Sequence, residues 1–222
     1  MQLKKLLTVI YYTSNRENPA FEKKVKENLL KVIGDLPLIS VSQKPIYFGE
    51  NIVVGDVGVS VQNAFRQFQI GAQHAKTPFV IAAEADTLYP KEYFKFVPEN
   101  INQCCVYDNV WFLDKKSKVG FVKQGYTGCA QVWGKDILIR HVDRRLKDKG
   151  QWNSKLEAAA KAPTMFGRPS WIYFHGETPV VSIKTPQGMG VFGKATPSAK
   201  PKTATKLPFW GTEKKLRKEM FS

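Results

Sequence analysis

Residues 77–93 read TPFVIAAEADTLYPKEY, and they carry the strongest structural signal in the chain. The apolar run from Pro78 to Ala83 leads directly into Glu84 and Asp86, and Pro90 follows a few residues later. A short apolar run bounded by turn residues is typical of a fully buried strand inside a parallel sheet. The segment therefore predicts an α/β fold that contains this strand.

Glu84 and Asp86 stand two residues apart, so on an extended chain both side chains point to the same side. Two carboxylates on one side repel each other and raise each other's pKa unless a cation lies between them. Mg²⁺ or Mn²⁺ supplies such a charge, usually bound by one or two carboxylates together with substrate phosphates. The alternative is an acidic strand end that only faces solvent.

Residues 60–94, SVQNAFRQFQIGAQHAKTPFVIAAEADTLYPKEYF, resemble the central block of GT-A-type (family-2-like) glycosyltransferases. In that family a helix runs into a hydrophobic strand capped by Asp-x-Asp, and a proline and aromatic residues follow. Here Glu84 stands where the family has its first Asp. The resemblance implies a Rossmann-like, mostly parallel mixed sheet flanked by helices. It also implies an enzyme that uses Mn²⁺ or Mg²⁺, held by Glu84 and the catalytic carboxylate Asp86, to move a sugar from a nucleotide-sugar such as a UDP-sugar to an acceptor hydroxyl.

The length of 222 residues suits one α/β domain followed by a tail. We expect residues 1–192 to form the GT-A-like domain and residues 193–222 to form a basic linker with a C-terminal helix. No apolar run approaches the ~20 residues that span a bilayer, and the three cysteines have no ligand-like spacing. These features favour a cytoplasmic protein with reduced thiols, in the host cytoplasm if a phage encodes it.

The net charge of +15 is large for a chain of this size, and basic residues recur in residues 140–168 and 184–218. Such a balance favours a polyanionic partner, which includes nucleic acid, an anionic membrane surface and an acidic glycan. DNA that bears a hydroxymethylated base, as in phage genomes, is an acceptor that would use the charge directly. The alternative is ordinary solubility charge together with attraction for a phosphate-bearing donor.

Periodicity and cap residues predict the remaining elements. The expected strands cover Leu3–Tyr12, Leu38–Val41, Cys104–Leu113 and Lys118–Lys123, the last two as a hairpin, with a strand-turn-strand unit over Ser170–Lys184. The expected helices cover Phe21–Ile33, Ser60 to about Ala75, Lys91–Val97, Lys135–Lys149 and Thr212–Phe221. Residues 47–58 are expected to form a loop.

Ligands of open α/β sheets bind beside the carboxyl ends of the strands. The resemblance places the donor beside the first strand, the loop over residues 47–58 and the helix that Ser60 caps. The implied donor contacts are Tyr12, Thr13, Asn15, Asp56, Asn63 and Arg66. The alternative is turn and helix-cap chemistry in the first loop and a solvated face on the helix.

The resemblance also assigns residues to the acceptor half of the molecule. Gly128 lies in a Gly-rich passage where the backbone passes close to sugar and acceptor, and Trp133 follows as a stacking platform or a core residue. Glu157 is the implied general base if the reaction inverts configuration. His175 is an implied third metal ligand, and Lys184 would neutralise the departing diphosphate.

Other functions stay open. A glycosyltransferase can act on a surface polysaccharide or a lipid-linked glycan instead of DNA. A non-catalytic nucleic-acid-binding protein can keep the scaffold, since Glu84 replaces the usual Asp and no paired base acids mark the site. A nucleotidyltransferase would normally show a Gly-rich phosphate loop after the first strand, and Thr13–Arg16 lacks the glycines.

Overall fold

The main sheet of the protein is mixed and mostly parallel. The structure is a computed structural model, and it describes residues 2–114, 120–123, 128–153, 171–185, 187 and 203–222. Within these residues the sheet runs in the order β10 (Trp171–Phe174), β6 (Cys104–Tyr107), β9 (Gln131–Gly134), β4 (Phe79–Glu84), β1 (Leu7–Thr13), β2 (Leu38–Ser42) and β3 (Glu50–Val53). Only β9 among these strands runs antiparallel to its neighbours. The predicted fold class is confirmed.

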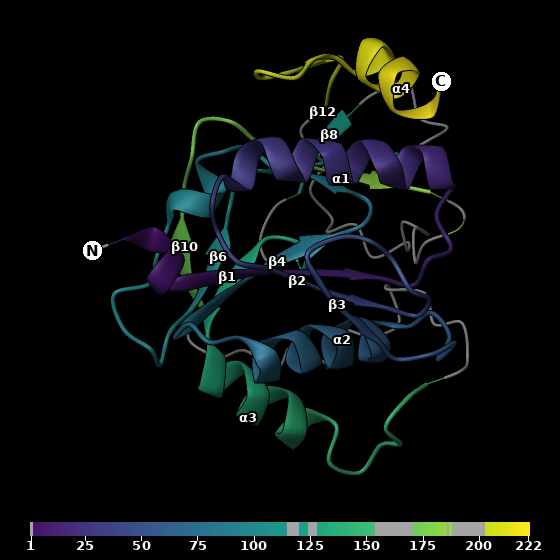
Figure 1. Ribbon diagram of the computed structural model, residues 1–222. Coiled ribbons are helices and arrows are strands. Elements are labelled where there is room, and N and C mark those ends of the chain that lie inside the picture. Colours follow the sequence, from purple (N-terminus) through teal and green to yellow (C-terminus); the bar gives the residue numbers. More distant parts are fainter. Residues whose placement is uncertain (1, 115–119, 124–127, 154–170, 186, 188–202) are drawn as a thin grey trace.

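Helices cover both faces of this sheet (Figure 1). The helix α1 (Pro19–Ile33) buries Leu29 and Ile33 in one core, and α2 (Val61–His74) and α3 (Lys135–Arg145) share the opposite core. The central strands β1 and β4 are buried along almost their whole length because both of their faces are covered. This burial explains the continuous apolar run at 78–83.

Cap residues fix where the helices begin. The Ser60 side chain accepts a hydrogen bond from the Asn63 backbone, and Asn18 accepts from Ala20 and Phe21 at the start of α1. Such caps satisfy backbone N–H groups that have no partner inside the helix. The predicted helix starts at Ser60 and Thr212 are confirmed, since Thr212 likewise caps α4 (Glu213–Phe221).

A second sheet corrects several of the expected strands. Its order is β12 (Thr203–Ala204), β8 (Gly120–Lys123), β7 (Val110–Asp114), β11 (Val180–Lys184) and β5 (Thr87–Leu88). The predicted strand over 104–113 divides at Asp108 and Asn109, so that β6 joins the main sheet and β7 joins the second one. The expected unit over 170–184 divides in the same way between β10 and β11. The β7–β8 hairpin is confirmed.

Smaller corrections concern two short elements. The expected loop over residues 47–58 contains the edge strand β3, and the expected helix over residues 91–97 is a single 3-10 turn, η2 (Tyr93–Lys95). A second such turn, η1 (Leu3–Lys5), precedes β1, so that the first strand begins later than expected. Propensity does not resolve elements this short because tertiary packing decides them.

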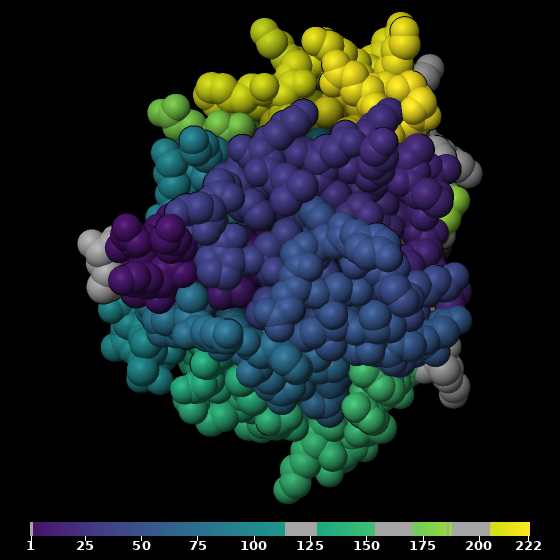
Figure 2. Space-filling view, in the orientation of Figure 1, coloured from purple at the N-terminus to yellow at the C-terminus, as the bar shows by residue number. Residues whose placement is uncertain are grey.

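The described part of the C-terminal segment packs back on the body. The hairpin of β13 (Lys206–Leu207) and β14 (Gly211–Thr212) leads into α4, which lies beside α1 in Figures 1 and 2. Leu216 and Met220 of α4 share an apolar core with Phe21, and the Phe21 and Phe221 rings stack with centroids 4.9 Å apart. None of the described helices is both long and apolar enough to cross a membrane.

Candidate functional site

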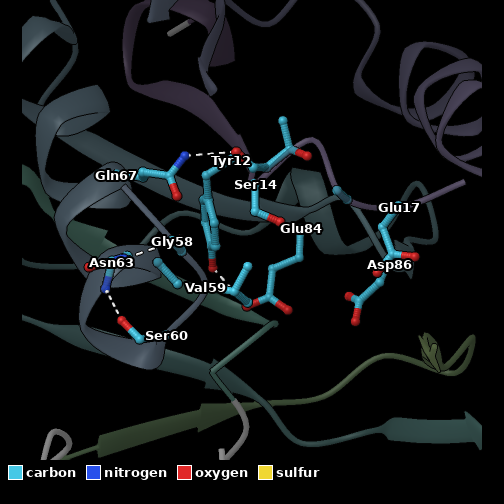
Figure 3. A pocket seen from close by; sticks show the side chains of 13 residues that line it. Tyr12, Ser14, Glu17, Gly58, Val59, Ser60, Asn63, Gln67, Glu84 and Asp86 are labelled. Carbon is cyan, nitrogen blue, oxygen red and sulfur yellow. Dashed lines mark hydrogen bonds between the residues drawn. The ribbon is translucent and has the colours of Figure 1, made fainter. Parts of the chain in front are cut away.

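A pocket opens at the carboxyl ends of the two central parallel strands, β1 and β4 (Figure 3). Its floor and one wall come from these strands and the residues that follow them, and the N-terminal part of α2 forms the opposite wall. The lining residues are Tyr12, Thr13, Ser14, Glu17, Gly58, Val59, Ser60, Asn63, Ala64, Gln67, Glu84, Ala85 and Asp86. This is the edge at which ligands of open α/β sheets bind.

Glu84 is the last residue of β4 and lies opposite Tyr12 of β1. The Tyr12 hydroxyl donates to Glu84 Oε1 at 2.9 Å, and the Glu84 backbone N–H donates to the Tyr89 hydroxyl. Burial, and then the nearby carboxylate of Asp86, raise the pKa of Glu84 to about 7. The carboxyl group therefore lies in a site that favours a neutral or cation-bound state.

Asp86 is held by a cation of the protein itself. Lys184 Nζ lies 3.1 Å from Asp86 Oδ2, and the Thr87 hydroxyl donates to Asp86 Oδ1 at 2.9 Å. The Lys184 and Asp86 side chains are only 20% and 16% exposed, so water screens this ion pair weakly. Burial alone lowers the pKa of Lys184, but Asp86 and Glu84 outweigh it and raise that pKa above its usual range. Lys184 is therefore charged at neutral pH.

Strand pairing brings Lys184 to this position from a distant part of the sequence. The short strand β5 follows the acid pair and pairs antiparallel with β11, with Ser182 opposite Thr87. One residue further along, the Ile183 backbone N–H donates to the Asp86 carbonyl at 2.7 Å. The next residue is Lys184, whose ammonium also lies 5.2 Å from the centre of the Phe112 ring. The second sheet thus places Lys184 at the acid pair.

Glu17 is a third carboxylate of the pocket, and sequence reasoning missed it. It is only 8% exposed, and the Thr185 hydroxyl lies 2.7 Å from both of its carboxylate oxygens. Burial raises the pKa of Glu17 to about 7, and the nearby Asp86 adds to this effect. Figure 3 shows Glu17 beside Asp86. The only sequence signal was an acid next to Asn18, in the loop that leaves the first strand.

Polar residues of α2 hold the opposite wall together. The Asn63 amide donates to the carbonyls of Val57 and Asn153, at 2.7 and 2.8 Å, and its oxygen accepts from the Asn153 N–H. Gln67, also missed from sequence, donates to the carbonyls of Thr13 and Val41. The predicted contacts Tyr12, Thr13 and Asn63 therefore line the pocket, and Asn63 fixes two loops of its rim.

Three other predicted donor contacts lie outside the pocket lining. Asn15 turns away, because its side-chain oxygen accepts from the Gln43 and Lys44 N–H groups. Asp56 is exposed and pairs with Arg16 at 3.0 Å. Arg66 points to α3, where it contacts Asp143 at 3.4 Å, so it does not line the pocket. Helical periodicity gives the faces of α2 but not which neighbour each face meets.

Of the residues predicted for the acceptor half, Gly128 lies near the pocket and Trp133 does not. Gly128 precedes β9, and the adjacent Cys129 carbonyl accepts from the Tyr89 hydroxyl that also contacts Glu84, so this passage reaches the site. Trp133 is completely buried between the main sheet and α3, which rules out the stacking platform and leaves the core role. Glu157 lies outside the described residues.

His175 does not join the acid pair. It follows β10, three strands from β4 in the main sheet, which is roughly 14 Å at about 4.8 Å per strand. Its Nδ1 lies 2.7 Å from Asp108 Oδ1, and the side chain is 68% exposed. Among the described residues, no three or more His, Cys, Asp or Glu side chains come close enough to hold a metal ion. The prediction of His175 as a third ligand is wrong.

The comparison with solved structures supports the fold. No family model and no curated protein matches the sequence. The crystal structure of S. aureus TarS 1–349 in complex with UDP-GlcNAc is similar over 81% of this chain, with a TM-score of 0.51 and 12% identity. This chain spans 59% of that TarS chain.

Two further solved structures are more distant. A glycosyltransferase involved in the glycosylation of the major capsid of PBCV-1 matches over 80% of this chain and 93% of its own, at 14% identity and a TM-score of 0.46. The bifunctional IspDF from Campylobacter jejuni matches over 78% and 50%, at 12% identity and a TM-score of 0.44. At 12% identity the match to TarS establishes the architecture alone, and that architecture is the GT-A-like glycosyltransferase fold.

Proposed function

We propose that this chain is a glycosyltransferase that moves a sugar from a nucleotide-sugar, a UDP-sugar in the first instance, to an acceptor hydroxyl. The observation that carries the proposal is the position of Glu84 and Asp86, which line a pocket at the carboxyl ends of the central strands of a GT-A-like fold. The TarS structure with UDP-GlcNAc supports the choice of donor. The pocket is where such a donor would meet the acid pair.

The acid pair fits a divalent cation, and we include Mn²⁺ or Mg²⁺ in the proposal. Both side chains are hard oxygen donors, and burial and Asp86 raise the pKa of Glu84 although Lys184 lowers it, so Lys184 compensates only part of the negative charge. Two carboxylates are enough when substrate phosphates complete the coordination. A bound ion would neutralise the donor diphosphate during bond cleavage. His175 is not among the proposed ligands of this ion.

The protein's own residues would then hold the donor and the acceptor. Tyr12 and Thr13 form the wall beside β1, and Asn63 positions the loops of the opposite wall. Lys184, charged and adjacent to Asp86, is close enough to the acid pair to help neutralise a departing diphosphate. Glu157 remains the proposed general base if the reaction inverts configuration.

For the acceptor we propose DNA that carries a hydroxymethylated or similarly modified base. Exposed basic residues lie at the end of α3 and just after it, with exposed acids among them: Arg144, Lys147 and Lys149 are basic, and Asp143 and Asp148 are acidic. The chain then reaches the pocket rim, where Gln62 donates to the Gly150 carbonyl at 2.6 Å. The basic side chains of this segment would contact a phosphate backbone beside the pocket. A surface polysaccharide or a lipid-linked glycan is the alternative acceptor.

One observation favours a different function. Asp86 is already paired with Lys184, and Glu84 with Tyr12, so the acid pair is satisfied without a metal ion. A nucleic-acid-binding protein that keeps the scaffold without catalysis would have this arrangement. Such a protein would bind DNA but would not turn over a donor.

The deciding experiment incubates the protein with a panel of UDP-sugars and Mn²⁺, with hydroxymethylated DNA, unmodified DNA or simple glycosides as acceptors. An enzyme releases UDP slowly even without acceptor, and faster with the right one. Asp86→Asn should lose this activity, whereas Asp56→Asn, which changes an exposed carboxylate outside the pocket, should keep it. DNA binding without any donor turnover would establish the non-catalytic function instead.

A further inference from the structure

We infer that Lys184 is a built-in counter-ion of the acid pair, and that a divalent cation displaces its ammonium group from Asp86 when it binds. This inference rests on the proposed function, because it concerns the cation of that reaction. It goes beyond it by assigning Lys184 a role before the donor arrives. The structural observations that carry it are the contacts of the lysine, its exposure and the charges around it.

The ammonium group occupies the position that a cation would take at Asp86. Lys184 Nζ lies 3.1 Å from Asp86 Oδ2, and Thr87 already donates to Oδ1. Both Asp86 oxygens therefore already accept a hydrogen bond, and the positive charge at Oδ2 repels an incoming cation. A divalent ion at Oδ2 would lie within a few ångströms of the ammonium, so its binding is favoured when the lysine moves away.

The lysine is held in a way that lets it move. Its backbone is fixed by the pairing of β11 with β5, and the next residue, Thr185, is tied to Glu17. Its ammonium, by contrast, has Asp86 as its hydrogen-bonding partner and the Phe112 ring 5.2 Å away. A flexible four-carbon stem on a fixed backbone allows the charge to swing over several ångströms.

The charges around the acid pair favour such an exchange. Glu84 and Asp86, when ionised, carry two negative charges, and Lys184 compensates one of them. A nucleotide-sugar diphosphate would meet a site with net negative charge and be repelled. After a divalent ion binds, these three side chains and the ion have a net charge of +1, or zero when Glu17 is also ionised, and the released Lys184 can contact the diphosphate. Metal binding would therefore precede donor binding.

If the Lys184–Asp86 pair has only a structural role, no cation binds at Asp86, and removal of the lysine should leave the affinity for Mn²⁺ unchanged. Removal of one partner of a buried pair leaves an uncompensated charge and destabilises the fold. A structural lysine, however, would not compete with an added cation. The affinity for Mn²⁺ in the absence of any donor separates the two roles, and it does not depend on whether the protein is an enzyme.

The test measures free Mn²⁺ by electron paramagnetic resonance in titrations of the full chain without nucleotide. Lys184→Met should bind Mn²⁺ at least tenfold more tightly than wild type, and Lys184→Arg, which keeps the charge, should stay close to wild type. Lys31→Met, which changes an exposed lysine on α1, is the matched control and should not alter the affinity. Lys184→Gln replaces Lys184→Met if the latter does not fold by circular dichroism.

Two further measurements complete the test. The double variant Lys184→Met, Asp86→Asn should lose the gain in Mn²⁺ affinity, which places the ion at Asp86. UDP in the presence of saturating Mn²⁺ should bind Lys184→Met about tenfold more weakly than wild type. Unchanged or weaker Mn²⁺ binding by a folded Lys184→Met, or no binding by any variant, would overturn the inference. Tighter Mn²⁺ binding without donor turnover would support the inference and remove the proposed enzyme activity.

Discussion

Tyr12 and Glu84 lie opposite each other on the two central strands, and the Tyr12 hydroxyl donates a 2.9 Å hydrogen bond to Glu84 Oε1. Burial and Asp86 raise the pKa of Glu84 to about 7, while this hydrogen bond acts in the opposite direction. Tyr12→Phe should therefore raise that pKa further. Because Glu84 must be ionised to hold a cation, we expect the lower pH limit of Mn²⁺ binding to move upward by roughly half a unit or more.

The measurement for Tyr12→Phe is Mn²⁺ affinity between pH 5.5 and 9. At the alkaline end the variant should approach wild type, because Glu84 is ionised in both proteins. Tyr47→Phe removes a hydroxyl from a fully exposed side chain and should leave the profile unchanged. A Tyr12→Phe profile that coincides with wild type at every pH would mean that Glu84 does not hold the cation.

Glu17 should make the stability of the protein depend on pH. Burial raises its pKa to about 7 in the folded state, above the unfolded value, so the folded state binds more protons between the two values. Stability from this group is therefore present at low pH and falls as the pH rises through about 7. Glu17→Gln cannot ionise, so at pH 8 it should be more stable than wild type by roughly 1–3 kcal/mol.

Urea unfolding of Glu17→Gln at pH 4 and pH 8 tests this expectation. Near pH 4 the two proteins should have similar free energies of unfolding, because Glu17 is protonated in wild type. Glu50→Gln changes an exposed carboxylate on β3 and should show no such difference between the two pH values. If the pH 8 stability of Glu17→Gln were equal to or below that of wild type, burial would not control the ionisation of Glu17.

Arg66 should contribute to stability and not to donor binding. Its guanidinium contacts Gln69 at 3.0 Å and Asp143 at 3.4 Å, on the side of α2 that packs on α3. Arg66→Met should lower the free energy of unfolding by about 1 kcal/mol, because Asp143 is largely exposed and water screens the pair. UDP affinity, measured by calorimetry with Mn²⁺, should stay within twofold of wild type. A tenfold loss of UDP affinity would mean that Arg66 contacts the donor after all.

Local sequence patterns were sufficient for the elements that depend on local chemistry. The buried strand before Glu84 follows from an apolar run between turn residues, and the start of α2 follows from the Ser60 cap. The polar pair Asp108 and Asn109, which separates β6 from β7, was visible in the sequence. It was missed because apolar residues on both sides suggested one continuous strand. The role of Trp133 could not be predicted either. An aromatic residue in a strand does not reveal whether other elements cover its side of the sheet.

The interactions that complete the site are not local and could not be found in this way. Lys184 lies 98 residues after Asp86, and Thr185 lies 168 residues after Glu17. Both contacts depend on the pairing of β11 with a strand of only two residues, β5. Strand propensity does not specify which distant strand is the partner. The acid pair was therefore predictable, but its counter-ion contact and the third carboxylate were not.

Asn63 provides a test of how the pocket wall is held. Its amide donates to the carbonyls of two loop segments of the rim, those of Val57 and Gly58 in one and that of Asn153 in the other. Asn63→Asp has nearly the same shape but cannot donate, so these three carbonyls lose a partner next to a new negative charge. We expect a loss of about 2–3 kcal/mol in the free energy of unfolding, and KM for the UDP-sugar should rise more than kcat falls.

The control for Asn63 is its neighbour Gln62, which donates to Gly150 of the same rim segment but does not line the pocket. Gln62→Glu removes one hydrogen bond and likewise places a negative charge beside a carbonyl, so it should cost about 1–3 kcal/mol with an unchanged KM. If both variants raised KM equally, general loosening of the segment around residues 150–153 would explain the effect. Of the two side chains, only that of Asn63 contacts the loop at residues 57–60. A rise in KM that is confined to Asn63→Asp would therefore mean that this loop forms the donor-binding wall.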